Sequence, residues 1–420
     1  MLQGPIGPFF KELSDFLKQE KQNVHKINFW GGDVLYYNDG INFKLDTSKW
    51  NSFFLNTLRQ KKITDLILFG DRRIYHEKAI EIITRERLKI RIWVFEEGYF
   101  RPNWITMDHY GANYRSSIRN LDDTSAISKT NNSHVTEIKP WIKEAVPTIG
   151  AYYAAGLISK YWFPNYEYHR TTHPLIEMSG WALKWFQNKA FPIKNNFSPL
   201  SNNFYICALQ LESDFQIRKY SPFKTMYEFM DLTMKSFSQN CQNNDFLIVK
   251  DHPYNEKWIK RKNECQLLSK KYNIEHRVVY IQNYPLSNLL NNCLGVVTSN
   301  SSLGLFIINE NIKVKALGNA FWNINDITYQ DKLDTFWQSN FKPNKKLVEK
   351  LNHNIFSKTQ YNGSFYSVTG RHLAIQNIKD VLLNGDQDIE NLQENLTVFF
   401  KNTKSPSSEN IKHKRVDFKV

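Results

Sequence analysis

One stretch of the sequence, IRIWVFEEGYFRP at residues 90–102, limits the possible folds more than any other. Its first six residues are apolar at nearly every position, which is typical of a buried strand. Two carboxylates, Glu96 and Glu97, follow directly, and Gly98 then ends the strand. Open α/β sheets bind ligands beyond the carboxyl ends of their strands. The stretch therefore predicts a reaction site at Glu96 and Glu97, although an isolated pair of this kind is more often two solvated loop acids.

The first half of the chain repeats a strand, a glycine-containing turn and a helix. Strands are predicted at residues 24–29 and 62–69, and the helix after the second one runs to about residue 87. This order is the βαβ pattern of a parallel sheet, so the polar residues that follow each strand should line one edge of that sheet. The candidate cleft residues of this half are Gly32, Asp33, Asp71, Arg73, His76 and Arg101.

The second half of the chain begins a new series of strands after residue 203. The strands are predicted at residues 204–210, 246–250, 278–281, 294–298 and 313–317, with helices between them. Polar side chains again follow the strands, which makes Gln210, Asp214 and Gln216 further cleft candidates.

Two strand ends of the second half carry groups that suit a phosphate. The sequence Lys250-Asp251-His252-Pro253 offers a point charge and a directional donor. The segment 299–302 precedes a helix, whose first N–H groups lack partners and whose dipole favours an anion. Taken singly, an ordinary N-cap serine and a satisfied core histidine explain these residues. Together they predict a nucleotide-phosphate pocket formed by Lys250, His252, Pro253, Ser299, Asn300, Ser301 and Ser302.

These observations predict an α/β fold in which two Rossmann-like domains face each other across a cleft, as in GT-B-like glycosyltransferases. No Walker A loop and no G-x-G-x-x-G motif follows any strand, which argues against kinases and dehydrogenases. The best linker is residues 191–203, which contain two prolines and several asparagines. We predict an acceptor and catalytic domain at 1–195, a donor-binding domain at 200–345, helices at 346–385 that pack back on the first domain, and a mobile basic tail at 386–420.

Charge and apolar content restrict the partners and the compartment. The net charge of +14 predicts a polyanionic partner, and because no nucleic-acid module is visible, an anionic membrane surface or a phosphorylated substrate is favoured over nucleic acid. No apolar run approaches the ~20 residues of a membrane span, and the N-terminus does not read as a signal peptide. We therefore expect a cytoplasmic protein. The cysteines form no C-x-x-C pair and are expected to be buried free thiols: Cys207, Cys241, Cys265 and Cys293.

Several motifs in sequence order resemble those of the capsule polysaccharide biosynthesis family, in particular its KpsS-type β-Kdo transferases. They are FGDRRIYH, EEGYFRPNWIT, LQLESDFQIRKYSPF, KDHP and TSNSSLGLFII, and the resemblance covers roughly residues 3–330. It implies transfer of Kdo from CMP-Kdo to lysophosphatidylglycerol with retention, which starts the capsule linker. This lipid acceptor, together with the net charge, the basic tail and the lack of an apolar span, predicts a peripheral location on the inner face of the inner membrane, beside other capsule-assembly enzymes.

The resemblance further implies roles for individual residues. Longer relatives carry Glu-Asp-Gly where this chain has Glu96-Glu97-Gly98, so Glu97 takes the place of a nucleophilic aspartate. Because successive side chains on a strand alternate, Glu96 is then expected to pair with Arg101 or Arg73, or to act as the acid/base. The KDHP and SNSS motifs correspond to those that hold the CMP phosphate. A retained configuration agrees with a carboxylate nucleophile and two displacements. Because the donor has a single phosphate, we predict no metal and no other cofactor.

Two other functions are compatible with parts of the sequence. A teichoic-acid-type polyol-phosphate transferase also uses a CMP leaving group, a His-Pro motif and a serine pair, but it lacks the EEGYFRP stretch. A non-catalytic scaffold for capsule assembly or export would not need the carboxylate of Glu97.

Overall fold

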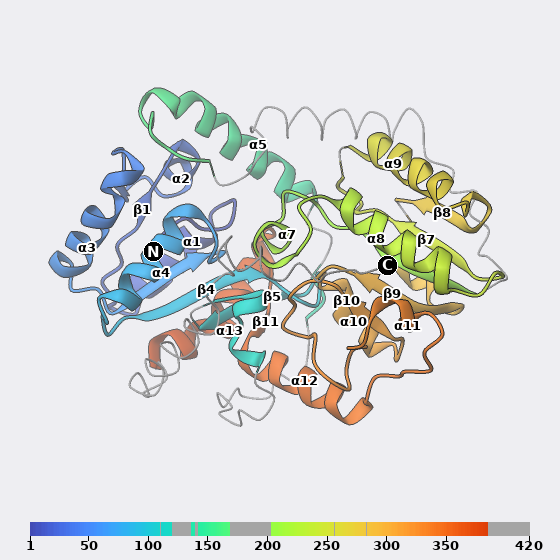
Figure 1. Ribbon diagram of the computed structural model, residues 1–420. Helices are drawn as coiled ribbons and strands as arrows, with labels where there is room; N and C mark the ends of the chain where they lie inside the picture. The colour runs from blue at the N-terminus through green and yellow to red at the C-terminus, as the bar shows by residue number, and fades with distance from the viewer. Residues whose placement is uncertain are drawn as a thin grey trace.

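The computed structural model describes residues 1–109, 111–119, 136–138, 142–168, 203–255, 257–282 and 284–384. Two α/β units, each built on its own sheet, lie side by side in Figure 1, and the N-terminal half of the chain forms the unit on the left. The linker predicted at 191–203, except for Asn203, and the tail at 386–420 lie outside the described residues.

The first sheet is mixed. Its order is β11-β5-β4-β3, in which β3 (Asp65–Phe69) runs parallel to β4 (Arg91–Glu97). Strand β5 (Trp104–His109) turns back antiparallel to β4, and β11 (Gln360–Asn362) pairs antiparallel with β5. The sequence predicted only parallel strands here and ended the central one at residue 95. Both glutamates instead belong to β4, and Gly98 begins a hairpin turn.

The strand predicted at 24–29 is reduced to two residues. β1 (Ile27–Asn28) and β2 (Ile41–Asn42) form a separate parallel pair. The first residues of the chain connect this pair to the main sheet, since the amide of Leu2 donates to the Ile67 carbonyl at 2.8 Å and the amide of Ile27 donates to the Met1 carbonyl at 3.0 Å. The N-terminal segment therefore bridges the β1–β2 pair and the main sheet of the first domain.

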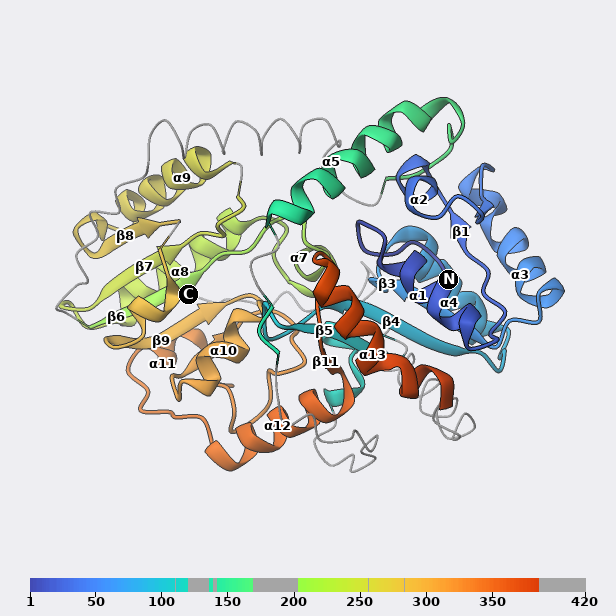
Figure 2. The same cartoon turned by 180° about the vertical axis from the view of Figure 1, so that it is seen from behind.

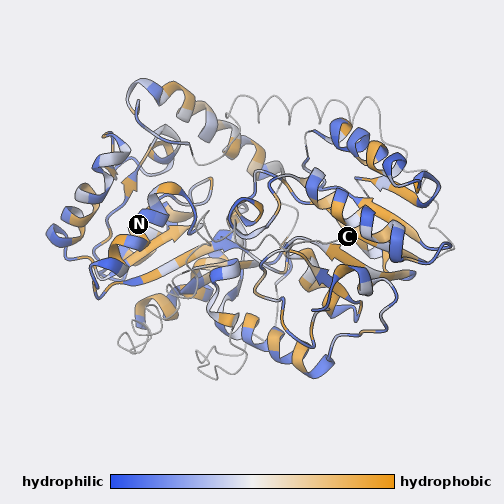
Figure 3. Ribbon diagram, viewed as in Figure 1, coloured by the Kyte–Doolittle hydropathy of each residue, from blue (hydrophilic) through white to orange (hydrophobic). Residues whose placement is uncertain are grey.

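Helices cover both faces of the first sheet. One face packs against α1 (Phe9–Gln19) and α13 (Val368–Asn384), and the other packs against α3 (Trp50–Gln60) and α4 (Ile74–Arg85). Apolar side chains alternate along β4 and so divide between the two cores. In Figure 3 the strands of both sheets contain hydrophobic stretches, coloured orange. Two more helices, α2 (Gly31–Tyr36) and α5 (Ile142–Ile158), pack together beside the sheet.

The second sheet has five parallel strands in the order β10-β9-β6-β7-β8. Their bounds lie within two residues of the predicted ones: β6 Phe204–Ala208, β7 Phe246–Lys250, β8 Val278–Ile281, β9 Cys293–Thr298 and β10 Val314–Ala316. One face packs against α8 (Met226–Asn240) and α11 (Leu333–Phe336), with α9 (Trp258–Lys271) contributing Cys265 and Leu268. The other packs against α10 (Leu303–Asn309) and α12 (Lys345–Lys358). A short helix, α7 (Phe215–Tyr220), occupies a segment that the sequence did not predict as helical.

The end of the chain returns to the first domain. After α12, strand β11 adds to the first sheet and α13 packs on the core that contains Phe9 and Phe95 (Figure 2). The predicted fold class is confirmed, since two α/β domains each carry their own sheet, and the correction is that the first sheet has two antiparallel strands. Because residue 360 lies far from residue 104 in sequence, local patterns could not reveal that pairing.

We predict that Gly32→Ala destabilises the fold. A Cβ at Gly32 would lie 2.8 Å from the Tyr152 carbonyl oxygen on α5, so α2 and α5 would have to separate. Overpacking of this kind typically costs about 1–3 kcal/mol, which urea denaturation would measure. Gly150→Ala on α5 is the matched control, since a Cβ there meets nothing within 4 Å and should leave stability equal or slightly higher. Unchanged stability of Gly32→Ala would contradict this packing role.

Candidate functional site

The two glutamates at the end of β4 have different surroundings. Glu96 accepts the Glu97 amide at 3.1 Å through its own Oε1, and it lies beside Gly70, which follows β3. Glu97 accepts a hydrogen bond from the hydroxyl of Tyr366, which precedes α13. Successive side chains on a strand point to opposite faces, so the two carboxyl groups diverge. Both are nevertheless half-buried at the same strand end.

Burial raises the pKa of Glu96 to about 7. The negative charges of Glu97 and Asp214 act in the same direction, while the hydrogen bond from the Glu97 amide and the charge of Arg73 oppose it. Asp214 belongs to the second domain, so a charge of that domain acts on Glu96 across the domain boundary. A carboxyl group with a pKa near 7 is suited to accept and donate protons at physiological pH.

The turn after β4 connects the two domains. The ring of Tyr99 lies 4.6 Å from that of Phe321, and the ring of Phe100 stacks on that of Phe356 at 4.7 Å. Arg101, by contrast, is exposed and donates from Nε to the Gly98 carbonyl at 3.3 Å. The aromatic pair of the EEGYFRP stretch therefore anchors the turn that carries the glutamates.

Gly32 and Asp33 hold α2 in place. Asp33 is buried and accepts hydrogen bonds from the Phe29 amide at 3.0 Å and the Tyr152 hydroxyl at 3.2 Å, while both of its oxygens lie 3.3 Å from the side-chain nitrogen of Gln3. These contacts fill the bonding capacity of the carboxylate, so the structure gives this strand end a packing role.

The residues after β3 lie closer to the glutamates. Arg73 donates to the Gly4 carbonyl at 3.0 Å and its charge reaches Glu96. His76 bonds the Gly70 carbonyl through Nδ1 at 2.8 Å, and burial together with the charge of Arg73 holds its pKa well below the usual range. Burial raises the pKa of Asp71, whereas the charge of Arg115, 3.9 Å away, lowers it. This strand end is a buried charge network beside the candidate catalytic pair.

Sequence reasoning missed Arg72, which contacts the other domain directly. Its guanidinium bonds the Tyr220 hydroxyl, lies 4.7 Å from the centre of that ring and pairs with Glu77. Glu77 also lies 3.3 Å from Lys219 of the second domain. The sequence signal for Arg72 was the pair of adjacent arginines in FGDRRIYH. Adjacent side chains on a turn point in different directions, and here Arg73 bonds Gly4 while Arg72 bonds Tyr220.

Strand order in the second domain brings the predicted donor residues to one edge. β9, β6 and β7 are adjacent and parallel, so the segments that follow them meet. Gln210 and Asn300 are linked twice, because Gln210 Nε2 donates to Asn300 Oδ1 and the Asn300 amide donates to Gln210 Oε1, each at 3.1 Å. Asn300 also donates to the Gln216 carbonyl at 2.8 Å, while the Asp214 carboxylate caps α7. These residues fix the loops that surround the pocket.

The KDHP turn orients its histidine through the buried Asp251. One oxygen of Asp251 accepts the His252 amide at 2.7 Å and the other accepts Asn255 at 2.7 Å. His252 accepts the Tyr254 amide through Nδ1 at 3.1 Å, so in the neutral ring Nε2 carries the proton and is a donor. Lys250 is buried at the end of β7, and burial lowers its pKa. Pro253 is exposed on the same turn.

The serine segment, residues 299–302, contains a buried hydroxyl at Ser299 and an exposed one at Ser302. Ser299 is buried and its hydroxyl lies 2.9 Å from that of Ser221, which makes it structural. Ser301 accepts the Leu303 amide at 3.2 Å, and Ser302 is exposed at the start of α10.

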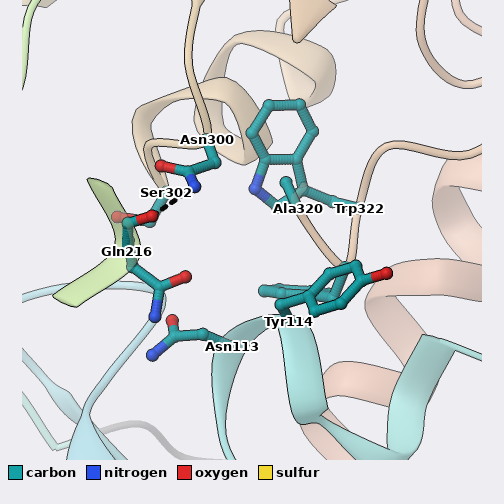
Figure 4. A pocket seen from close by; sticks show the side chains of 8 residues that line it. Asn113, Tyr114, Gln216, Asn300, Ser302, Ala320 and Trp322 are labelled. Atoms are coloured by element: carbon teal, nitrogen blue, oxygen red, sulfur yellow. Dashed lines mark hydrogen bonds between the residues drawn. The ribbon is translucent and has the colours of Figure 1, made fainter. Parts of the chain in front are cut away.

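A pocket lies where these loops meet the first domain (Figure 4). Asn300, Ser302 and Gln216 form one side of it, opposite Trp322. Asn113 and Tyr114, from the loop after β5, complete it from the first domain. The remaining sequence candidates, including Glu97, Lys250 and His252, are not among its lining residues. The residues that sequence reasoning missed are Asn113, Tyr114, Ala320, Phe321 and Trp322.

The described residues also bear on metal binding and on membrane crossing. Within these ranges, no three His, Cys, Asp or Glu side chains are placed to hold a metal ion. None of the helices in the described part of the chain has the length and apolar character that crossing a bilayer requires.

A family model described as "Capsule polysaccharide biosynthesis protein" matches residues 64–366, which include β3, β4 and the whole second sheet. The chain belongs to the capsule polysaccharide biosynthesis family. The match contains both glutamates, the KDHP turn, the serine segment and Tyr366, so the site described above lies within the part that defines this family.

Curated members of the capsule polysaccharide biosynthesis family are similar over most of the chain. The capsule polysaccharide export protein KpsS of Escherichia coli is 29% identical over 375 residues, which cover 87% of this chain and 96% of KpsS. The capsule polysaccharide modification protein LipB of Neisseria meningitidis serogroup B is 29% identical over 387 residues, covering 87% and 91%. Among solved structures, the Thermosulfurimonas dismutans KpsC β-Kdo 2,7 transferase is 13% identical with a TM-score of 0.41, covering 86% of this chain and 100% of that one.

The raised pKa of Glu96 predicts a pH dependence of stability. Glu96 holds its proton to about pH 7 in the folded protein, against about 4.5 without the fold. In that window the folded state binds more protons than the unfolded state, so the free energy of unfolding falls as pH rises. Glu96→Gln removes this fall and should exceed wild-type stability above pH 7 by up to about 3 kcal/mol.

Urea denaturation at pH 5 and pH 8 would measure the effect on stability. Glu349→Gln, at an exposed position on α12, is the control and should leave the wild-type pH dependence unchanged. The same pH dependence in Glu96→Gln as in the wild type would show that Glu96 titrates normally.

Proposed function

We propose that this protein is a glycosyltransferase that moves Kdo from CMP-Kdo to a lysophosphatidylglycerol acceptor with retention, producing the β-Kdo linkage on which a capsule polysaccharide is built. The observation that carries the proposal is that the charge of Asp214, after β6, acts on Glu96 at the end of β4, while the segments after β6 and β9 line a pocket with Asn113 and Tyr114 of the first domain. Family membership gives the capsule context. The choice of Kdo and of the lipid follows from the resemblance of the motifs, and both are part of the proposal.

In this proposal the second domain stabilises the departing CMP. CMP leaves as a phosphate monoester anion, and preorganised donors lower the cost of that charge. Lys250 supplies a positive charge from the end of β7, and His252 supplies an N–H that the Asp251 turn orients. Asn300 and Ser302 offer polar groups on the pocket wall, and the rings of Tyr114 and Trp322 offer flat surfaces for a base.

The two glutamates are proposed to divide the reaction. A retaining transfer needs an ionised carboxylate that attacks the sugar carbon and a group that moves the acceptor proton. Glu97 receives a hydrogen bond from Tyr366, which orients its carboxyl group, and is the proposed nucleophile. Glu96, with a pKa of about 7, is the proposed acid/base. CMP departs when the Glu97 oxygen bonds the anomeric carbon, and the acceptor oxygen then displaces Glu97.

The acceptor and the charge of the chain place the enzyme, in this proposal, on the inner face of the inner membrane. A net charge of +14 favours an anionic lipid surface. Other capsule-assembly enzymes are the proposed neighbours there. The proposed reaction uses no metal ion or other cofactor, because the donor carries a single phosphate.

Two alternatives predict different behaviour. A polyol-phosphate transferase would use a CMP-linked polyol phosphate as donor and would form no sugar adduct on a glutamate. A capsule-assembly or export scaffold would not depend on either carboxyl group, and the name of the Escherichia coli relative, an export protein, is the reason to keep this alternative.

Glu97→Gln should bind the donor and fail to transfer it. The amide keeps the shape of the side chain but cannot attack carbon, so turnover should fall by several orders of magnitude while CMP-Kdo affinity changes little. Glu349→Gln is the matched control and should retain activity. In the wild type, mass spectrometry after acid quenching should find a Kdo adduct on the peptide that contains both glutamates, and fragmentation should assign it to Glu97. An adduct on Glu96 would reverse the assigned roles.

His252→Ala and Lys250→Ala should each weaken CMP binding. Loss of one charged hydrogen bond costs about 1.5–3 kcal/mol, which corresponds to roughly 10- to 150-fold in affinity. Calorimetry with CMP would measure this, and His276→Ala, an exposed histidine of the same domain, is the control. Wild-type CMP affinity in both variants would remove Lys250 and His252 from the donor site.

A further inference from the structure

Between residues 146 and 158, helix α5 has one face that is apolar and exposed. Val146 is 58% exposed and Ile158 is 66% exposed, and between them the exposed positions of this face are Pro147, Ala151 and Ala154. Pro147, Ala151, Ala154 and Ile158 recur every three or four residues, which places them on one side of the helix, and Val146 lies next to Pro147. No charged side chain interrupts the face between its ends. A surface helix normally presents polar residues to water, so this face needs an explanation.

The opposite face of α5 is fixed against the first domain. Tyr152 and Tyr153 are buried against Trp30, and a Cβ at Gly156 would lie 2.1 Å from the ring of Trp30. The Tyr152 hydroxyl also accepts the indole N–H of Trp30 at 2.8 Å. Because this side is closely packed, the helix cannot rotate to bury its apolar face.

Two large aromatic side chains end the apolar face. In the 3₁₀ turn η4 (Ser159–Tyr161) and just after it, Tyr161 is 93% exposed and Trp162 is 60% exposed. Lys160 is exposed between the helix and these rings, and Lys44 lies nearby with its ammonium 5.9 Å from the ring centre of Phe163. Trp and Tyr with adjacent lysines are the residues enriched where a protein surface meets lipid headgroups.

We propose that this face, residues 146–162, docks the protein on an anionic phospholipid bilayer, with Ile158, Tyr161 and Trp162 entering the headgroup region. The choice of a bilayer rests on the lipid acceptor of the proposed function and on the lysines beside the aromatic end. Helix α5 runs along one border of the molecule in both Figure 1 and Figure 2, from a point near α7 at the domain junction outward past α2. A membrane on this border therefore adjoins the interdomain site at one end of the helix.

The experiment measures sedimentation of the purified full chain with vesicles of phosphatidylglycerol and phosphatidylcholine. Ile158→Ser/Trp162→Ser should weaken binding at least tenfold. Ile259→Ser/Leu267→Ser is the matched control, since those side chains are 55% and 64% exposed on α9 of the second domain, and it should bind as the wild type does. Ala154→Glu is a second test that adds one charge at an exposed helical position, and it should also weaken binding.

Activity on a short-chain acceptor dissolved below its micelle concentration separates this inference from the proposed function. Retained activity on that acceptor together with lost vesicle binding supports the docking face. Wild-type vesicle binding in both α5 variants overturns it, and so does a change of oligomeric state without a change of vesicle binding, which would identify a second copy as the occupant. Absence of transfer by the wild-type protein would remove the proposed function and leave the vesicle result to be judged by itself.

Discussion

The turn between β4 and β5 has to satisfy both domains at once, and the rest of the site depends on it. Its two aromatic side chains, Tyr99 and Phe100, pack on Phe321 and Phe356, which belong to the second half of the chain. The amide of Tyr99 donates to Gln360 at 2.9 Å, so the turn is also tied to the edge strand β11. Because this turn directly follows the two glutamates, the contacts between the domains set where the carboxyl groups lie relative to the loops of the second domain.

The position of the β4 strand end also explains why two adjacent glutamates have different surroundings. Strand geometry sends Glu96 toward the charges of Arg73 and Asp214, and it sends Glu97 toward Tyr366. Burial raises the pKa of Glu96, and a hydroxyl donor orients the carboxyl group of Glu97. Tyr366 reaches Glu97 only because the end of the chain returns to the first sheet, so the last described elements contribute to the site built on β4.

Sequence patterns predicted the second domain well and the first one only in part. All five strands of the second sheet are parallel and flanked by helices, so each appears as a short apolar run with a polar end. In the first sheet, β5 follows a hairpin turn and β11 comes from residue 360, a pairing that depends on packing and not on local composition. Asp33 illustrates the same limit for the site, since a polar residue after a strand was indistinguishable from a ligand-binding one until its buried partners were known.

The central claim of the proposed function is that this protein transfers Kdo to a lipid. The most direct measurement is incubation of the purified protein with CMP-Kdo and a fluorescent lysophosphatidylglycerol, followed by mass spectrometry and by NMR of the anomeric linkage in the product. The account predicts release of CMP and a single added Kdo in the β configuration, dependent on Glu97. A product with inverted configuration, or no Kdo on the lipid while CMP still binds, would contradict it.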